Sequence, residues 1–315
     1  MISGLQLIEK EICSKITDEL DKVGILYRIF SRIKNKKSID EKTLRKKEEG
    51  KPYLIDGKQM QDIIGVRIVT YFKDDVDIVY SILKTQFKYV SEEIDDFELT
   101  VFKPKRTNII CRLNEKHSEI FKEVQQASHK DSFKLIDNTF ELQLRTILSE
   151  GWHEVDHSLR YKCKSDWEQH KENERMLNGI YANLETNDIV LKNLFNELAY
   201  KHYKNKNWEG LIRNKFRLNF QLLPLKKELI EILNNNNELG KQIFKLERNF
   251  IIYSISSLEI SFPINLTNLV YLINCLILKN IEIYKITPGL ILDEFKIDIS
   301  IISVNIEKSS TSLHN

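Results

Sequence analysis

The hydrophobic positions in the first half of the chain alternate between helical and strand spacing. Apolar residues at helical spacing begin the chain: Leu5, Ile8, Ile12, Ile16, Leu20 and Val23. We therefore predict that residues 5–47 are helical. The later part of this stretch, RIFSRIKNKKSIDEKTLRKKEEGK, is basic and ends at a Gly and a Pro. DIIGVRIVTYF, from Asp62 onward, is then an apolar, β-branched run of strand length.

The same alternation continues to about residue 165. DDVDIVYSILKTQF has helical spacing with acids at its start, and EEIDDFELTVFKPKRTNIICRL is typical of a loop and strand. Residues 114–134 are polar, and we predict a loop with a short helix there. FELQLRTIL alternates as a strand does, and SEGWHEVDHSLRYK is helical in spacing. The pattern predicts an α+β fold with a mixed sheet flanked by helices.

The second half of the chain changes character. Residues 166–210 are charged and helical in pattern, and we expect them to pack on a domain formed by residues 1–165. Residues 211–315 form a mainly helical extension without a chemical motif. The Asn234–Asn237 run predicts a helix end and a turn. EIYKITPGLILDEFKIDISIISVNIEK alternates loosely and predicts short strands.

Composition narrows the class of protein. The 315 residues are 42% hydrophobic and 30% charged with a net charge of +2, as in ordinary globular proteins. The four cysteines are far apart, which argues against a disulfide framework or a cysteine zinc site and suits a reducing cytoplasm. The N-terminus does not resemble a signal peptide, and the longest apolar run, LVYLINCLIL, is too short to span a bilayer.

A basic segment carries the first candidate chemistry. Between residues 28 and 58 there are 11 Lys and Arg against 5 Asp and Glu, so the local charge is 11 − 5 = +6. The segment contains R-x-K-x3-S-x3-K, formed by Arg32, Lys34, Ser38 and Lys42. On a helix the last three would line one face. Such a stripe suits a polyphosphate, and the alternative is a solvated lysine face.

Two carboxylates complete this candidate site. Asp62 stands immediately before the strand IIGVRIV, where an isolated acid is usually a turn residue. Alternation in FELQLRT places Glu141, Gln143 and Arg145 on the face opposite Phe140, Leu142 and Leu144. Two carboxylates from neighbouring strands beside a basic segment are what a Mg²⁺–nucleotide site requires.

Four blocks in this order resemble the synthetase domain of RelA/SpoT-type alarmone synthetases: RIKNKKSIDEK, DIIGVRIVTYF, ELQLRT and the W…DH…YK helix. The resemblance covers roughly residues 20–165 and implies a nucleotidyltransferase-like sheet. It also implies Mg²⁺-dependent transfer of the β,γ-pyrophosphate of ATP to the 3′-hydroxyl of a guanine nucleotide.

The resemblance implies a role for each matching residue. Arg32 would stack on the adenine, while Lys34, Ser38 and Lys42 would hold the ATP phosphates. Asp62 would bind Mg²⁺, and Glu141 would share the metal and help to deprotonate the attacking hydroxyl.

The acceptor segment departs from the family pattern. Family members carry Pro-Lys followed by Gly-Tyr-x-Ser-x-His, whereas this chain reads FKPKRTNIICRL. The candidate acceptor-binding residues are therefore basic or polar: Lys105, Arg106, Gln143, Arg145, His157 and Lys162. Three alternatives stay open: another acceptor such as the 3′ end of tRNA, a solvated loop, and a catalytically silent nucleotide sensor. The paired Asp62 and Glu141 argue against the sensor.

HEVDH, at residues 153–157, matches the H-E-x-x-H signature of zinc proteases. We interpret it instead as part of the helix that the resemblance places near the nucleotide, because no downstream third ligand has a distinctive context. Helical spacing predicts a core face through Leu148, Trp152, Val155 and Leu159. No His-Asp dipeptide occurs, so we expect synthesis without hydrolysis. By resemblance alone, C-terminal helices would form a homo-oligomer.

Overall fold

The structure is a computed structural model that describes residues 2–95, 102, 107–128, 131–221, 223–258, 260 and 262–297. The chain divides into two compact units, residues 1–20 with 26–192 and residues 21–25 with 193–315. The main boundary lies inside the long helix α7 (Lys171–Lys204). The three-part division at residues 165 and 210 stays a prediction.

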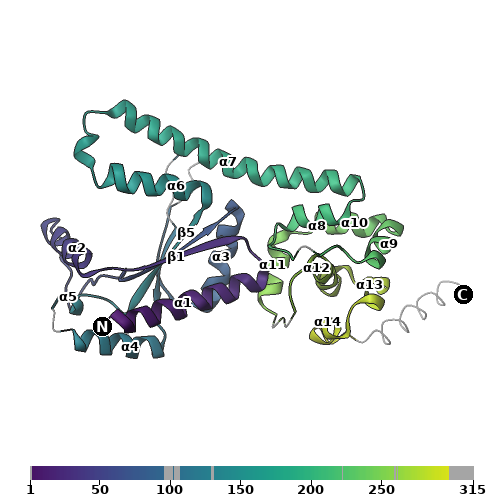
Figure 1. Cartoon of the computed structure of the whole chain (residues 1–315), viewed down its shortest axis with the longest axis horizontal. Helices are drawn as coiled ribbons and strands as arrows, with labels where there is room; N and C mark the ends of the chain where they lie inside the picture. The colour runs from purple at the N-terminus through teal and green to yellow at the C-terminus, as the bar shows by residue number, and fades with distance from the viewer. Residues whose placement is uncertain are drawn as a thin grey trace, which may run out of the picture. The chain divides into compact units, whose positions relative to one another are not determined.

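The first unit is built on a five-stranded mixed sheet (Figure 1). Its strands are β1 (Tyr27–Ile33), β2 (Ile64–Thr70), β3 (Tyr89–Ile94), β4 (Thr107–Arg112) and β5 (Thr139–Thr146). The spatial order is β1-β2-β5-β4-β3, in which β2 and β5 are parallel and the other neighbours antiparallel. The predicted mixed sheet flanked by helices is confirmed.

Helices cover both faces of this sheet. They are α1 (Ile2–Val23), α2 (Lys36–Glu48), α3 (Lys73–Gln86), α4 (Glu115–Ala127), α5 (Asp131–Lys134), α6 (Ile147–Val155), the π-helical η1 (Asp156–Tyr161), the 3-10 turn η2 (Lys164–Asp166) and the first part of α7. Figure 1 shows α1 and α4 on one side of the sheet and α6 on the other. The indole N–H of Trp152 joins α6 to α7 by donating to the carbonyl of Leu177 at 2.8 Å.

The two faces of the sheet differ in character because side chains alternate along each strand. One face is buried and apolar and includes Val66, Ile68, Ile109, Leu142 and Leu144. The other, called the polar face below, carries partly exposed residues: Gly65, Arg67, Glu141, Gln143 and Arg145. The register places Gly65 beside Glu141 and Arg67 beside Gln143, so the polar residues of β2 and β5 are neighbours.

The prediction of one helix over residues 5–47 is wrong. Helix α1 ends at Val23, where Gly24 takes a left-handed conformation with a φ of 71° that favours glycine. Residues 27–33 then form β1, which is stabilised by antiparallel pairing with β2. Asn35 begins α2 by accepting the backbone N–H of Ser38 at 2.9 Å. Lys34 therefore lies between β1 and α2 and not on a helix.

Residues 114–134 are more helical than expected. Asn114 caps α4, and the buried His117, Phe121 and Val124 give this polar segment one packed side.

The predicted core face of the HEVDH helix is also wrong in part. Trp152 is buried, but Val155 and Leu159 are exposed. The chain changes to π-helical hydrogen bonding from Asp156, so positions at α-helical spacing no longer share one face.

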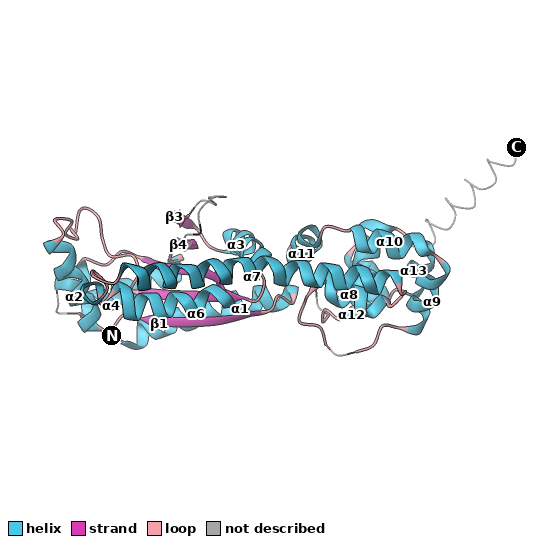
Figure 2. Cartoon of the chain, turned by 90° about the horizontal axis from the view of Figure 1, so that it is seen from above, coloured by secondary structure: helices cyan, strands magenta, loops and turns pink. Residues whose placement is uncertain are grey.

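The second unit is helical throughout its described residues (Figure 2). Its helices are α8 (Trp208–Phe216), α9 (Lys227–Asn235), α10 (Asn237–Lys245), α11 (Arg248–Ser256), α12 (Leu266–Ile273), the π-helical η3 (Asn274–Leu278), α13 (Ile281–Ile286) and α14 (Gly289–Glu294). The predicted helix end and turn at Asn234–Asn237 are confirmed. A Cβ at Gly240 would lie 2.3 Å from the Trp208 ring, so α8 and α10 approach closely only because residue 240 is glycine.

The short strands predicted near the C-terminus are not present among its described residues. Residues 281–297 contain α13 and α14, with Ile283, Tyr284 and Ile291 buried in the core of the second unit. Burial of these apolar side chains favours helix over the loose alternation in the sequence. Residues 298–315 lie outside the described part of the chain.

Across the described ranges, no helix combines the length and apolar character that a membrane span requires.

Candidate active site

A carboxylate with two lysines lies where the chain enters β2. The Asp62 Oδ2 atom accepts hydrogen bonds from the Lys34 ammonium and, at 2.6 Å, from the Lys42 ammonium. The side chains come from three places in the sequence: the end of β1, the middle of α2 and the residue two before β2. The antiparallel pairing of β1 with β2 brings Lys34 to Asp62, and one turn of α2 beyond Ser38 brings Lys42 there.

Burial and charge oppose each other in this cluster. Burial alone would raise the pKa of Asp62, but Lys34 and Lys42 outweigh it and hold that pKa below its ordinary value. Burial lowers the pKa of Lys34 against the attraction of Asp62. Asp62 is therefore ionised at neutral pH. Its second oxygen, Oδ1, is buried and has no hydrogen-bond partner in the described chain.

Glu141 provides the second carboxylate. It lies on the polar face of β5, where its Oε2 accepts a hydrogen bond from Gln143 Nε2 at 3.0 Å. Burial raises the pKa of Glu141, and the negative charge of Asp62 raises it further. Strand pairing places Glu141 beside Gly65, which follows Asp62 by three residues. A carboxylate with a raised pKa is a stronger base than a solvated one.

These two carboxylates are the residues that could hold a divalent cation. An ionised, buried Asp62 oxygen that lacks a hydrogen-bond partner suits such an ion, and Glu141 adds a second oxygen ligand. Among the described residues, no group of three or more His, Cys, Asp or Glu is arranged to hold a metal. Mg²⁺ commonly takes one or two carboxylates and completes its shell with water and substrate phosphates, so the pair fits Mg²⁺ bound together with a nucleotide.

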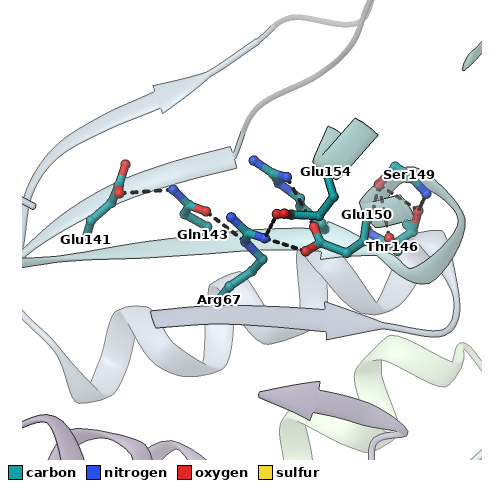
Figure 3. A network of polar contacts seen from close by, with 8 residues as sticks. Arg67, Glu141, Gln143, Thr146, Ser149, Glu150 and Glu154 are labelled. Atoms are coloured by element: carbon teal, nitrogen blue, oxygen red, sulfur yellow. Dashed lines mark hydrogen bonds and ion pairs between the residues drawn. The ribbon is translucent and has the colours of Figure 1, made fainter. Parts of the chain in front are cut away.

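An ion-pair network that the sequence reasoning missed continues along the polar face (Figure 3). Arg67 donates to Gln143 Oε1 at 3.0 Å and is also bound by Glu150 and Glu154 of α6. Glu150 accepts a second guanidinium, that of Arg145, at 3.1 Å. The signal in the sequence was Arg67 itself, a single charge within the apolar run IIGVRIV, together with two acids four residues apart.

Two cavities open over the polar face. The first, of about 500 Å³, is lined by Phe30, Arg32, Arg67, Glu141, Gln143 and Glu150, among others. The second, of about 510 Å³, shares Arg32, Arg67 and Gln143 with the first and adds Arg145, His157 and Lys162. The two cavities thus bring together six of the predicted site residues: Arg32, Glu141, Gln143, Arg145, His157 and Lys162. Each cavity has room for part of a nucleotide.

The remaining predicted residues differ in how they are placed. Ser38 lies in the first turn of α2, where its backbone N–H binds Asn35, and it lines neither cavity. Burial lowers the pKa of Arg145, and Arg67 lowers it further. Lys105 and Arg106 lie outside the described residues, so their predicted contact with the acceptor stays a prediction.

The two histidines of HEVDH have different surroundings. His153 is buried against Trp152 and Tyr181, with ring centroids 5.4 and 6.2 Å away. His157 is exposed and stacks on Tyr161 with ring centroids 5.8 Å apart. Burial lowers the pKa of His157, and the charge of Lys162 lowers it further, so this imidazole is neutral at pH 7.

Comparison with known proteins finds a similarity for this part of the chain. Residues 31–166 match the family model described as the region found in RelA / SpoT proteins. This part of the chain is therefore similar to the RelA/SpoT family that its motifs resemble. The matched range contains β2 to β5, the last three residues of β1, Asp62 and Glu141, and every residue that lines the two cavities except Phe30. None of the curated proteins compared with the chain matches it.

Several solved structures are also similar. A GTP pyrophosphokinase family protein from Streptococcus pneumoniae is 21% identical over 60% of this chain and 87% of its own, with a TM-score of 0.44. Small alarmone synthetase 1 from Bacillus subtilis is 20% identical over 60% of this chain and 93% of its own, with a TM-score of 0.42. The same Bacillus protein bound to its product pppGpp is 20% identical over 62% and 96%, with a TM-score of 0.43.

Proposed function

We propose that the first unit is a Mg²⁺-dependent pyrophosphotransferase that moves the β,γ-pyrophosphate of ATP to the 3′-hydroxyl of a guanine nucleotide. One observation carries the proposal. Asp62, with two lysines and an oxygen that has no partner, lies near the partly exposed Glu141, whose pKa is raised, inside the region that matches the RelA/SpoT family.

The donor phosphates bind at the lysine end of the polar face. Lys34 and Lys42 already converge on one carboxylate oxygen, so a polyphosphate beside Asp62 is within reach of both ammonium groups. Ser38, in the first turn of α2, adds a hydroxyl and the positive end of a helix, which favours anions. Arg32 lines both cavities and is placed to contact the adenosine part of ATP.

Asp62 and Glu141 would hold Mg²⁺. Bound there together with ATP, Mg²⁺ would neutralise charge on the transferred phosphates. Lys34 and Lys42 offset the same charge from the other side, because their ammonium groups exchange Asp62 Oδ2 for phosphate oxygens when the nucleotide binds. The roles of these residues in the reaction are thus binding, charge neutralisation and alignment of the donor.

Glu141 acts as the base. The 3′-oxygen of the acceptor attacks the β-phosphorus of ATP, and the bond from that phosphorus to the oxygen bridging the α-phosphorus breaks. AMP leaves with the bridging oxygen, and the proton of the 3′-hydroxyl passes to Glu141. Burial raises the pKa of Glu141, which favours this proton transfer, and Gln143 fixes the carboxylate by donating to Oε2.

The acceptor occupies the second cavity. Arg145, His157 and Lys162 line it, so it presents positive charge and an imidazole to the phosphates of a nucleotide. Glu141, Gln143 and Arg145 alternate along β5, so an acceptor bound at Arg145 would lie on the same face of the strand as Glu141. Lys105 and Arg106, which precede β4, would add positive charge.

The test is label transfer from ATP carrying radioactive β- and γ-phosphates. Purified full-length chain is mixed with Mg²⁺ and, in separate reactions, with GDP, GTP or bulk tRNA. We expect label on GDP or GTP, with loss of transfer in EDTA and recovery with Mg²⁺. Label on tRNA alone would show that the acceptor is the 3′ end of an RNA and not a guanine nucleotide. ATP binding without transfer to any acceptor would instead support a nucleotide sensor.

A further inference from the structure

An exposed aromatic ring belongs to the wall of the first cavity. Phe30 is 52% exposed, yet it lies in the middle of β1 and lines the cavity beside Arg32 and Arg67. Neither the sequence motifs nor the reaction described above assigns it a role. Isolated exposed apolar residues are common on protein surfaces, so exposure alone implies nothing. The position of this ring relative to Lys34 and Lys42, where the donor phosphates are proposed to bind, points to a role in binding.

Strand pairing fixes where the ring lies. Phe30 and Arg32 are two residues apart on β1, so both project from the polar face. The antiparallel register places Phe30 directly beside Arg67 and Arg32 directly beside Gly65. Arg67 is held by Gln143, Glu150 and Glu154, so its guanidinium is a fixed neighbour of the ring. Phe30 is thus part of an ordered wall.

The distance from the phosphate end matches the length of a nucleotide. Asp62 and Arg67 are five residues apart, and the chain bends at Ile63 before β2 begins, so at most about 16 Å separates them. That is the reach of an extended nucleoside triphosphate from its terminal phosphate to its base. With the phosphates at Lys34 and Lys42, the base therefore arrives at the row that contains Phe30 and Arg67.

The floor of the cavity is open between these two ends. Gly65 lies between Arg32 and Glu141 in the strand register, and it has no side chain to fill the space above the sheet. A Cβ at this position would already lie 3.8 Å from the Arg32 side chain. Any larger residue would project into the path between the phosphates and the base.

We propose that Phe30 provides an aromatic stacking surface for the purine base of the donor nucleotide, next to Arg32 on the same face of β1. The inference rests on the proposed function, because it takes the donor phosphates to lie at Lys34 and Lys42. Every base has a flat π-face, and stacking on an aromatic side chain stabilises the bound nucleotide without contributing to its phosphate contacts. Phe30 is therefore a specificity residue that distinguishes a nucleoside triphosphate from a bare polyphosphate.

The experiment compares two ligands that share phosphates but not a base. Binding of ATP and of inorganic tripolyphosphate, each with Mg²⁺, is measured by calorimetry on the full chain. Phe30→Leu should weaken ATP binding by about 5- to 100-fold and leave tripolyphosphate binding unchanged. Phe250→Leu is the matched control, because Phe250 is 53% exposed and lies in the second unit. Phe250→Leu should leave the binding of both ligands unchanged.

A second variant guards against a folding artefact. Phe30→Trp keeps an aromatic platform, so it should bind ATP at least as tightly as the original chain. Its added fluorescence should be quenched by ATP and not by tripolyphosphate. Unchanged ATP binding in Phe30→Leu, or equal weakening of both ligands, would reject the role of Phe30 while the proposed function stands. Failure of the unmodified chain to bind ATP would reject both.

Discussion

The two faces of the central sheet are made by the same strands and have opposite compositions. On β5, Leu142 and Leu144 are fully or almost fully buried, while Glu141, Gln143 and Arg145 between and beside them are partly exposed. The buried face stabilises the unit by removing apolar surface from water. The polar face stabilises nothing by burial. Holding charged side chains there costs free energy, and ion pairs and hydrogen bonds between these side chains offset that cost.

This difference separates the residues that set stability from those that set activity, although they are adjacent in sequence. A substitution on the polar face should change binding or turnover in a folded protein. A substitution one residue away should change the free energy of unfolding and leave the chemistry of the folded molecules intact.

The largest effect is expected from Glu141→Gln. The substitution keeps the size of the side chain and its contact with Gln143 but removes the base, so transfer should fall by about 10²- to 10⁴-fold. ATP binding should stay close to that of the original chain. The measurement is single-turnover label transfer beside calorimetric ATP binding. Retention of the original transfer rate would show that Glu141 is not the base.

Leu142→Ala changes the neighbouring residue on the buried face and tests the same difference between the two faces. Leu142 is 0% exposed, so the substitution leaves a cavity and should lower the free energy of unfolding by about 2–5 kcal/mol. Urea titration followed by circular dichroism measures this change. Transfer per folded molecule should remain within a small factor of the original. Loss of transfer at full folding would mean that the two faces are not separable.

Lys34→Gln should weaken ATP binding by about 10- to 100-fold, because it removes a charge-assisted contact with the donor phosphates. Lys37→Gln is the matched control: Lys37 follows three residues after Lys34, in the first turn of α2, with 84% of its side chain exposed. The Michaelis constant for ATP in the transfer reaction measures the effect of each substitution. Equal effects of the two substitutions would reduce the role of Lys34 to general positive charge.

The smallest effect concerns a carboxylate outside the polar face. Burial raises the pKa of Asp188, and its Oδ2 accepts the Thr146 hydroxyl at 2.7 Å at the end of β5. The folded protein therefore holds this proton more tightly than the unfolded chain does, so stability falls as pH rises from the ordinary Asp value to the raised one.

Asp188→Asn removes this titration. Its melting temperature relative to the original chain should therefore increase with pH across that window and then level off. The exposed Asp40→Asn serves as the control and should show a flat difference. A melting-temperature difference for Asp188→Asn that is independent of pH would contradict the assignment.

The sequence predicted the parts of the site that depend on local alternation. FELQLRT alone places Glu141, Gln143 and Arg145 on one face, and the structure agrees. The segment around Arg32 was harder, because YRIFSRI becomes a strand only through its pairing with β2, and no local pattern contains that partner. The convergence of Lys34 and Lys42 on Asp62 was not predicted, because it depends on tertiary pairing and not on a continuous helix.

The contacts between elements could not be predicted from the sequence for the same reason. Arg67 was visible as one charge in an apolar strand, but its partners Glu150 and Glu154 come from a helix more than 80 residues later. The role of Phe30 likewise depends on the register that places it beside Arg67. Lys105 and Arg106 lie outside the described residues, and their predicted role still depends on the sequence alone.

One measurement tests the central claim most directly. The unmodified chain and Glu141→Gln are incubated with Mg²⁺, GDP and ATP labelled in both transferable phosphates, and the products are separated. The account predicts that the unmodified chain forms a guanine nucleotide carrying both labelled phosphates, with one AMP for each product, and that Glu141→Gln forms almost none. Equal yields from the two proteins, or release of ADP with transfer of a single phosphate, would contradict it.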